Sequence, residues 1–227
     1  MQLSNFQSFS PKLRESIELV IVDDCSQESP LLVEQLPIDG LKVVLARVLE
    51  NKAWNHLAAR NIGAHEASGE GLFLHDMDIL IPEKTASLAF NLAIRGNLRG
   101  KVFTFSRFGY FDGSIRSVHH DTMLINRGDF WETGGFDEDF QGIYGAGPLF
   151  SKRVERKFLA ETVLDHHVWS LSQDVLPDSA TRSYSRTPGF KNRLKLKALV
   201  LGKALRLLNR VTSMQCEYQV LWDWKKA

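Results

Sequence analysis

Two carboxylates stand one residue apart directly after an apolar run of the sequence. Residues 71–74 read Gly-Leu-Phe-Leu, and Asp76 and Asp78 follow within four positions. Two acids at a chain reversal can turn toward the same hard divalent cation, which prefers oxygen ligands. A cation held there can bridge a diphosphate and stabilise charge on a departing nucleotide. The alternative is that both acids lie on the surface and cap the next helix.

A second acidic pair, Asp23 and Asp24, ends another apolar run over residues 17–22. One of these acids can accept hydrogen bonds from a base or a ribose, while the other caps the following turn. Arg60 lies in a helical pattern before the Asp76 run and can hold a phosphate in a bidentate fork. The alternatives are a turn without a ligand and an arginine that is solvated or salt-bridged.

A double glycine introduces a third acidic segment, Gly134–Phe140. The glycines allow a tight loop, and Asp137 and Glu138 behind them can meet a hydroxyl-rich ligand. An exposed acidic turn is the alternative. Further along, His166 and His167 are candidate metal ligands or general bases, although histidines beside apolar residues are also common structural groups.

The elements that must position these residues alternate between strand and helix. Apolar runs rich in β-branched or aromatic residues predict strands, and apolar residues at helical spacing predict helices. The predicted strands cover residues 17–22, 42–46, 71–74, 101–105 and 122–125, and the predicted helices cover residues 53–68 and 82–94. This alternation indicates an α/β fold, in which polar residues at the carboxyl ends of strands face the ligand crevice.

The order of these pieces resembles the nucleotide-sugar half of family 2 glycosyltransferases with the GT-A fold. A strand ending in Val-Asp-Asp precedes Ala-Arg-Asn-x-Gly, and a later strand ends in Asp-x-Asp. The segment Gly-Gly-Phe-Asp-Glu-Asp-Phe and the following Gly-x-Tyr-Gly are similar to the acceptor segment of galactosyltransferase-like and polypeptide N-acetylgalactosaminyltransferase-like enzymes. The resemblance covers about residues 12–170. It implies a GT-A type, mostly parallel sheet flanked by helices, with a Rossmann-like nucleotide-sugar half.

The resemblance also implies roles for individual residues. Asp24 corresponds to the acid that contacts the base or ribose of a nucleotide such as UDP, and Arg60 to a residue near the diphosphate. Asp76 and Asp78 correspond to the metal-binding pair, with Asp78 as the direct ligand and Asp76 also near the nucleotide sugar. His167 resembles the histidine that completes a manganese site.

The acceptor side of the resemblance rests on the loop after the double glycine. Gly135 and Phe136 match residues of the family's acceptor-side loop, as do Asp137 and Glu138. The family usually has Gly-Glu-Asp after the Tyr-Gly pair, and the carboxylate there is the catalytic base for inverting transfer. This chain has Ala-Gly-Pro-Leu at residues 146–149. Asp137 and Glu138, the nearest acids, are therefore the candidate catalytic residues, and a retaining mechanism or an inactive relative would need no such base.

A second departure concerns the start of the sheet. Family members normally begin with a central strand that ends in Pro-x-Tyr-Asn, about 30 residues before Val-Asp-Asp, and this chain starts too late to include it. We therefore expect the strand over residues 17–22 to lack one neighbour and to expose a pairing edge.

The function implied is a glycosyltransferase that moves a sugar from a nucleotide-sugar donor, such as a UDP-sugar, to a saccharide or lipid-linked glycan acceptor. The implied cofactor is Mn²⁺ or Mg²⁺. One alternative is a degenerate relative that binds a nucleotide sugar or glycan without transfer, because the usual base and first strand are missing. A dimanganese phosphoesterase of the Asp-His-His type is a third interpretation, but the bulky residues 79–82 after the acids disfavour two metals.

Composition narrows the setting of this chemistry. The chain has 227 residues, 44% of them hydrophobic, which is enough for one well-filled core. A formal net charge of +1 gives no reason to expect a nucleic-acid partner. Two cysteines, the absence of an 18-residue apolar run and the absence of a signal-peptide pattern predict a cytoplasmic protein.

The charge is unevenly distributed, since residues 191–226 contain nine Lys/Arg and only two acids. We expect a glycosyltransferase domain over residues 1–175 and a tail over residues 176–227 that holds a basic amphipathic helix. Residues 191–210 would contact the inner face of a membrane or an anionic partner. The alternative is that the apolar stripe of this helix packs on the protein's own core.

Overall fold

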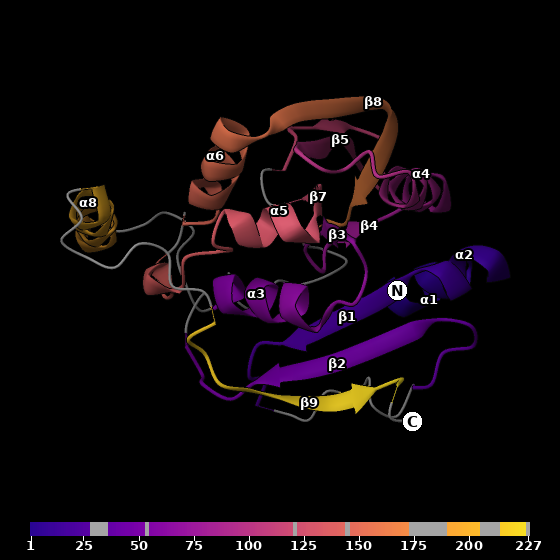
Figure 1. Cartoon of the computed structure of the whole chain (residues 1–227), viewed down its shortest axis with the longest axis horizontal. Helices are drawn as coiled ribbons and strands as arrows, with labels where there is room; N and C mark the ends of the chain where they lie inside the picture. Colours follow the sequence, from indigo (N-terminus) through magenta and orange to yellow (C-terminus); the bar gives the residue numbers. More distant parts are fainter. Residues whose placement is uncertain are drawn as a thin grey trace.

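Two β-sheets and the helices around them form the framework of the computed structural model (Figure 1). The structure describes residues 1–27, 36–52, 55–119, 122–143, 146–172, 190–204 and 214–225. The elements are α1 (Gln2–Gln7), α2 (Pro11–Ser16), β1 (Glu18–Asp23), β2 (Lys42–Val48), α3 (His56–Glu66), β3 (Gly71–Leu74), β4 (Ile79–Leu80), α4 (Glu83–Ile94), β5 (Lys101–Gly109), β6 (Ile115–Arg116), β7 (Met123–Asn126), α5 (Arg127–Glu132), the 3₁₀ helix η2 (Glu138–Phe140), α6 (Gly147–Lys157), β8 (Leu159–Ser170), α8 (Phe190–Ala204) and β9 (Tyr218–Asp223).

The smaller sheet has the order β1-β2-β9 and carries α3 on one face (Figure 1). β1 and β2 are parallel, while β9 pairs antiparallel with the other edge of β2. β2 is nearly continuous in buried apolar side chains, as expected for a strand with neighbours on both edges. Because β9 comes from residues 218–223, the chain's last described segment belongs to the body. The tail predicted over residues 176–227 is therefore not separate from the body over its whole length.

The larger sheet has the order β3-β7-β5-β8-β4, with β6 paired to β5. Only β5 and β8 are parallel among these pairs, and the others are antiparallel. The predicted α/β class is confirmed, but the sheet is mixed rather than mostly parallel. The short turn over residues 110–114 joins β5 to β6, and such short reversals join antiparallel strands.

All seven elements predicted from the sequence are present. β1, β2, β3, β5 and β7 are the predicted strands, and α3 and α4 are the predicted helices. α3 ends two residues earlier than expected, with Ala67 in an extended conformation (φ −61°, ψ 132°) before the predicted capping glycine, Gly69. The sequence did not indicate β8, because most of its side chains are exposed or half-buried and only Val168 is buried.

β1 and β3 each keep one unpaired edge within the described part of the chain, since β1 pairs with β2 and β3 pairs with β7. A cavity of about 1070 Å³ is lined by both strands and by side chains of α1, α3 and α4. Among the described residues, the strand over residues 17–22 thus has one neighbour, and its other edge lines a largely apolar cavity.

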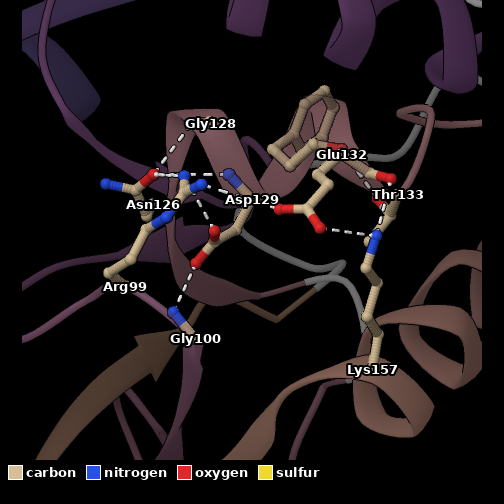
Figure 2. Close-up of polar contacts among 9 residues, drawn as sticks. Arg99, Gly100, Asn126, Gly128, Asp129, Glu132, Thr133 and Lys157 are labelled. Carbon is tan, nitrogen blue, oxygen red and sulfur yellow. Dashed lines mark hydrogen bonds and ion pairs between the residues drawn. The ribbon is translucent and has the colours of Figure 1, made fainter.

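A buried carboxylate ties the connection before β5 to the connection after β7 (Figure 2). Asp129 in α5 is 1% exposed, accepts a hydrogen bond from the Gly100 N–H at 2.7 Å and pairs with Arg99 at 2.9 Å. The side chain of Asn126 caps α5 by accepting from the Gly128 N–H at 2.9 Å. Together these contacts fix how the β7 end of the sheet meets the start of β5.

Replacing Asp129 by alanine should lower the free energy of unfolding by about 2–3 kcal/mol, because a buried N–H and the Arg99 guanidinium then lose a charged acceptor. Glu132→Ala on the same helix is the matched control, since Glu132 is half exposed and its pairs with Lys157 and Arg99 lie at the surface. Such surface pairs contribute about 0–1 kcal/mol. Urea unfolding of both variants measures the difference, and equal losses would contradict this account of Asp129.

Candidate functional site

Helix α3 joins the acidic ends of β1 and β3. Its N-cap residue, Asn55, lies beside the Asp24 carboxylate beyond β1, close enough for its N–H groups to oppose the rise in the pKa of that acid. Further along the same helix, Arg60 forms an ion pair with Asp76 beyond β3. Asn55 and Arg60 are separated by about 7.5 Å along a helix axis. Asp24 thus lies near the start of α3, and Asp76 pairs with Arg60 near the middle of the same helix.

The two oxygens of the Asp76 carboxylate face different cations. Arg60 donates to one oxygen, and Nδ1 of His119 lies 3.7 Å from the other. Desolvation alone would raise the pKa of Asp76, but the attraction of Arg60 and His119 holds that pKa below its usual value. Asp76 is therefore an anion at neutral pH, held in place between two elements of the fold.

Asp78 is in a different electrostatic position from its neighbour. Its backbone carbonyl accepts from the Leu171 N–H at 2.8 Å, which anchors the turn beside the end of β8. Its carboxylate forms no ion pair with the residues that the structure describes. Desolvation and the charge of Asp76 raise the pKa of Asp78, while His119 and Arg107 oppose that rise. A positively charged ligand would stabilise the charged form of the Asp78 carboxylate.

Asp24 lies partly open to solvent, with protein crowded around its carboxylate. Desolvation, together with the charge of the adjacent Asp23, raises its pKa to about 6, against the opposing hydrogen bonds from Asn55. A carboxylate with this pKa is a better hydrogen-bond acceptor than an ordinary aspartate. This property suits an acid that accepts from a hydroxyl or N–H group of a ligand.

The loop predicted to meet the acceptor is fastened to α3 by Asn61. Asn61 is fully buried; its amide accepts from the Phe136 N–H and donates to the Phe136 carbonyl, both at 2.8 Å. Gly135 has φ +66°, and a Cβ at this position would lie 2.7 Å from the Asn61 side-chain oxygen, so a glycine is required. The Phe136 ring is fully buried against Phe150. Phe136 therefore supports the loop from inside and presents no ring to an acceptor, contrary to the sequence-based expectation.

Glu138 is the best-connected carboxylate of the described chain. It accepts from the side chains of Asn61 at 2.8 Å and Gln141 at 3.2 Å, and from three backbone N–H groups. Those three N–H groups belong to Met214, Gln215 and Cys216. A buried carboxylate with this many donors joins the segments that supply them. The contacts thus disagree with the predicted role of Glu138 as a catalytic base.

Asp137 caps η2 by accepting from the Asp139 N–H at 3.2 Å and is 5% exposed. The charge of Asp137 attracts the guanidinium of Arg153, which also donates a hydrogen bond to the Gly135 carbonyl. Asp137 is thereby fixed within the loop beside Glu138. The Tyr144–Gly145 pair that follows lies outside the described residues.

This geometry agrees with a match to a known family. Residues 7–174 match the family model described as Glycosyl transferase family 2. The chain belongs to this family. The resemblance expected over about residues 12–170 is therefore confirmed. No curated protein matches the chain at a significant level.

Solved structures share the fold of this family 2 member at low sequence identity. S. aureus TarS 1-349 in complex with UDP-GlcNAc has a TM-score of 0.61 and 15% identity, covering 80% of this chain and 56% of that chain. GalNAc-T7 with UDP, GalNAc and Mn²⁺ has a TM-score of 0.58 and 18% identity, covering 75% of this chain and 40% of that chain. The chain therefore spans about half the length of the solved structures that it matches, and the predicted GT-A type fold is confirmed.

The described residues of this family 2 member hold no group of three or more His, Cys, Asp or Glu side chains arranged for a metal ion. His167 in particular is not gathered with Asp76 and Asp78. Its ring packs against Trp169 at 4.5 Å and Phe108 at 5.4 Å between centroids, and its backbone carbonyl accepts from Thr85. Two carboxylates alone can still hold Mg²⁺ or a similar ion when substrate phosphates supply further ligands.

The structure adds site residues that the sequence did not single out. Asn55 and Asn61 connect α3 to the two acidic segments, and Arg107 and His119 face the Asp76 and Asp78 carboxylates. The only sequence signal for the asparagines was their place on the helix that bears Arg60. Arg107 and His119 belong to the segment around β6, which had no predicted element.

Replacing Asp24 by asparagine should stabilise the protein more at pH 8 than at pH 4. The raised pKa means that the folded state disfavours the charged carboxylate, so its contribution to stability is lost as pH rises from about 4 through about 6. Asparagine does not ionise, so the variant does not lose this stability as pH rises. Urea unfolding at pH 4, 6 and 8 gives the comparison, with the exposed Asp39→Asn as control. A stability difference independent of pH would show that the folded state does not perturb Asp24.

Proposed function

We propose that this family 2 member transfers a sugar from a UDP-sugar to a saccharide or lipid-linked glycan acceptor. The observation that carries the proposal is that α3 joins two strand-end acids and an arginine at one site, through Asn55 with Asp24 and Arg60 with Asp76. The matched family and the UDP or UDP-GlcNAc in the solved structures of similar fold support the choice of donor.

In this proposal each residue of the site acts on one part of the donor. Asp24 accepts hydrogen bonds from the base or ribose, and Arg60 pairs with the diphosphate. Asp76 and Asp78 hold a divalent cation, Mn²⁺ or Mg²⁺, with diphosphate oxygens as further ligands. The cation supplies positive charge beside the departing diphosphate. GalNAc-T7 was solved with Mn²⁺, which supports a divalent ion here.

A specific observation favours a second candidate function, the binding of a nucleotide sugar or glycan without transfer. Glu138 is held by five donors, and Asp137 is 5% exposed as the cap of η2. The two acids nearest to the missing base motif thus stabilise the loop through their hydrogen bonds. An assay of UDP release from a UDP-sugar separates the two functions. A transferase should release more UDP when an acceptor extract is added, whereas a binding protein forms a complex without releasing UDP.

Donor binding should depend on the divalent cation and on Asp78. Calorimetric titration with UDP-GlcNAc should show at least tenfold tighter binding in Mn²⁺ than in EDTA, since two anions otherwise meet the diphosphate. Asp78→Asn in Mn²⁺ should resemble the wild type in EDTA. Asp112→Asn is the matched control, because Asp112 is an exposed acid paired with Arg116 away from the two carboxylates. Equal affinity with and without the cation would refute the metal role.

We also propose that α8 rests on an anionic membrane surface. Leu194 and Leu201 are 51% and 58% exposed and lie on one face of the helix, with exposed Lys191 and Lys197 on either side of it. At 3.6 residues per turn, the half-buried Leu196 and Leu199 point to the opposite side, where they pack against the core. α8 lies at the side of the molecule, away from both sheets (Figure 1). Leu205, Leu208, Arg206 and Arg210 of the predicted helix lie outside the described residues.

This arrangement differs from a helix whose whole apolar stripe packs inward, because separate leucines serve the core and the solvent-facing side. Basic residues beside an exposed apolar stripe are typical of interfacial helices, and each contributes about 1 kcal/mol near an anionic leaflet. No helix in the described part of the chain is long and apolar enough to cross a membrane. The contact proposed is therefore peripheral.

Vesicle flotation should detect this contact. The wild type should float with vesicles of phosphatidylserine and phosphatidylcholine at low salt, and it should stay behind with phosphatidylcholine alone or at high salt, where charges are screened. Leu201→Glu should abolish flotation, whereas Leu164→Glu should not, although Leu164 is an exposed leucine on β8. A wild type that ignores anionic vesicles would remove the membrane proposal.

A further inference from the structure

Arg107 occupies a position that the sheet itself does not favour. It lies near the end of β5, directly opposite Arg116 of β6 in the antiparallel register. Like charges placed opposite one another destabilise a pair of strands. Arg116 is compensated by Asp112, at 3.0 Å, within the same hairpin. Among the described residues, no carboxylate of the hairpin pairs with Arg107. The acids that attract its positive charge therefore lie outside the hairpin.

Arg107 lies within electrostatic range of the two acids of the site. Asp78 and Asp76 attract its guanidinium, while desolvation and Arg116 lower its pKa. One amino group lies 3.5 Å from the Ser117 hydroxyl, and Nε is buried without a hydrogen-bond partner among the described residues. An arginine keeps its charge under these conditions. Its donors are therefore only partly used in the protein without ligand.

Arg107 approaches the acids from a different element than Arg60 does. Arg60 comes from α3 and contacts one oxygen of Asp76, whereas His119 lies near the other oxygen and belongs to the segment behind β6. Arg107 and His119 therefore reach the two acids from elements other than α3. Two arginines from different elements thus approach the two carboxylates, and the His119 ring lies beside Asp76.

We propose that Arg107 is a phosphate-binding residue that contacts the diphosphate of the donor. The inference rests on the proposed function, since it assumes that Asp76 and Asp78 mark the place of that diphosphate. When a divalent cation neutralises the acids, the attraction between Arg107 and Asp78 weakens and the guanidinium fork can turn to phosphate oxygens. The two parallel N–H donors of an arginine guanidinium can bind two phosphate oxygens in one plane. A solvated surface arginine makes no such bidentate contact.

The same contact acts during transfer. The bond between the anomeric carbon and the β-phosphate oxygen breaks, and its electron pair remains on that oxygen. The acceptor oxygen forms the new bond to the anomeric carbon and loses its proton to solvent. UDP thereby gains one negative charge, and a positively charged donor already in place stabilises this charge more than it stabilises the bound donor. Arg107 therefore affects turnover as well as binding.

The test compares Arg107→Ala with Arg116→Ala, its cross-strand neighbour in the same hairpin. Calorimetry in Mn²⁺ with UDP and with uridine separates phosphate recognition from base recognition. We expect Arg107→Ala to weaken UDP binding about tenfold or more and to leave uridine binding unchanged, because only UDP offers phosphate oxygens. Arg116→Ala should bind both ligands like the wild type. Arg107→Lys should restore part of the UDP affinity, since it keeps the charge and loses the fork.

The outcomes distinguish this inference from the proposed function. If the wild type binds UDP and Arg107→Ala binds it equally well, the inference fails and the proposed function stands. If the wild type binds neither UDP nor uridine, the proposed function fails, and inorganic pyrophosphate with Mn²⁺ becomes the probe. Loss of pyrophosphate binding in Arg107→Ala then upholds the anion site, and unchanged or absent binding overturns it. Circular dichroism and thermal unfolding of each variant confirm that it is folded.

Discussion

The side-chain amide of Asn61 matches the backbone of Phe136 with one acceptor and one donor, and its NH₂ group also reaches Glu138. Both residues are buried, so each of these polar groups would otherwise lack a partner in a region without water. Glu138 in turn gathers the backbone N–H groups of Met214, Gln215 and Cys216. Through this sequence of contacts, one face of α3 fixes the loop after α5 and the segment that leads into β9.

The site depends on the neighbouring residues of the same helix. Arg60 precedes Asn61 and lies over the Phe136 ring at 5.3 Å while it pairs with Asp76. A helix that is packed on β1 and β2 and fastened to a buried loop has little freedom to rotate. Arg60 therefore meets Asp76 in a set geometry, and Asn55 meets Asp24 for the same reason. Positioning of this kind is what the binding of a large, charged donor requires.

The surrounding charges shift the pKa values of the two acids of the Asp-x-Asp pair in opposite directions. Arg60 and His119 stabilise the charge of Asp76, whereas Asp78 bears the effect of desolvation and of its charged neighbour. In the proposed site, a divalent cation would remove the repulsion between the acids and weaken their attraction for Arg107. The proposed roles of Asp78 and Arg107 are thus two consequences of one distribution of charge.

The acids of the site could be found from the sequence because their signal is local. Apolar runs such as residues 17–22 and 71–74 can form only buried strands, and the polar residues after them must lie at strand ends. The order of these local signals also indicated the family, and with it the fold. Contacts between distant segments left no such mark. Nothing near Glu138 in the sequence shows that it accepts hydrogen bonds from the distant segment Met214–Cys216. Likewise, nothing near Arg107 shows that its charge acts on Asp78.

The tertiary structure decided the remaining points, and it did so through burial and strand pairing. Phe136 and Glu138 looked like loop residues open to an acceptor, but both lie in the interior, because a double glycine turns the loop inward over α3. His167 belongs to a long strand whose pairing with β5 sets its ring beside Phe108 and Trp169. β9 joins the first sheet although it ends the chain. Local sequence determined the elements and the acids at their ends, whereas side-chain burial and strand partners depend on residues far apart in the sequence and are determined only when the whole chain packs.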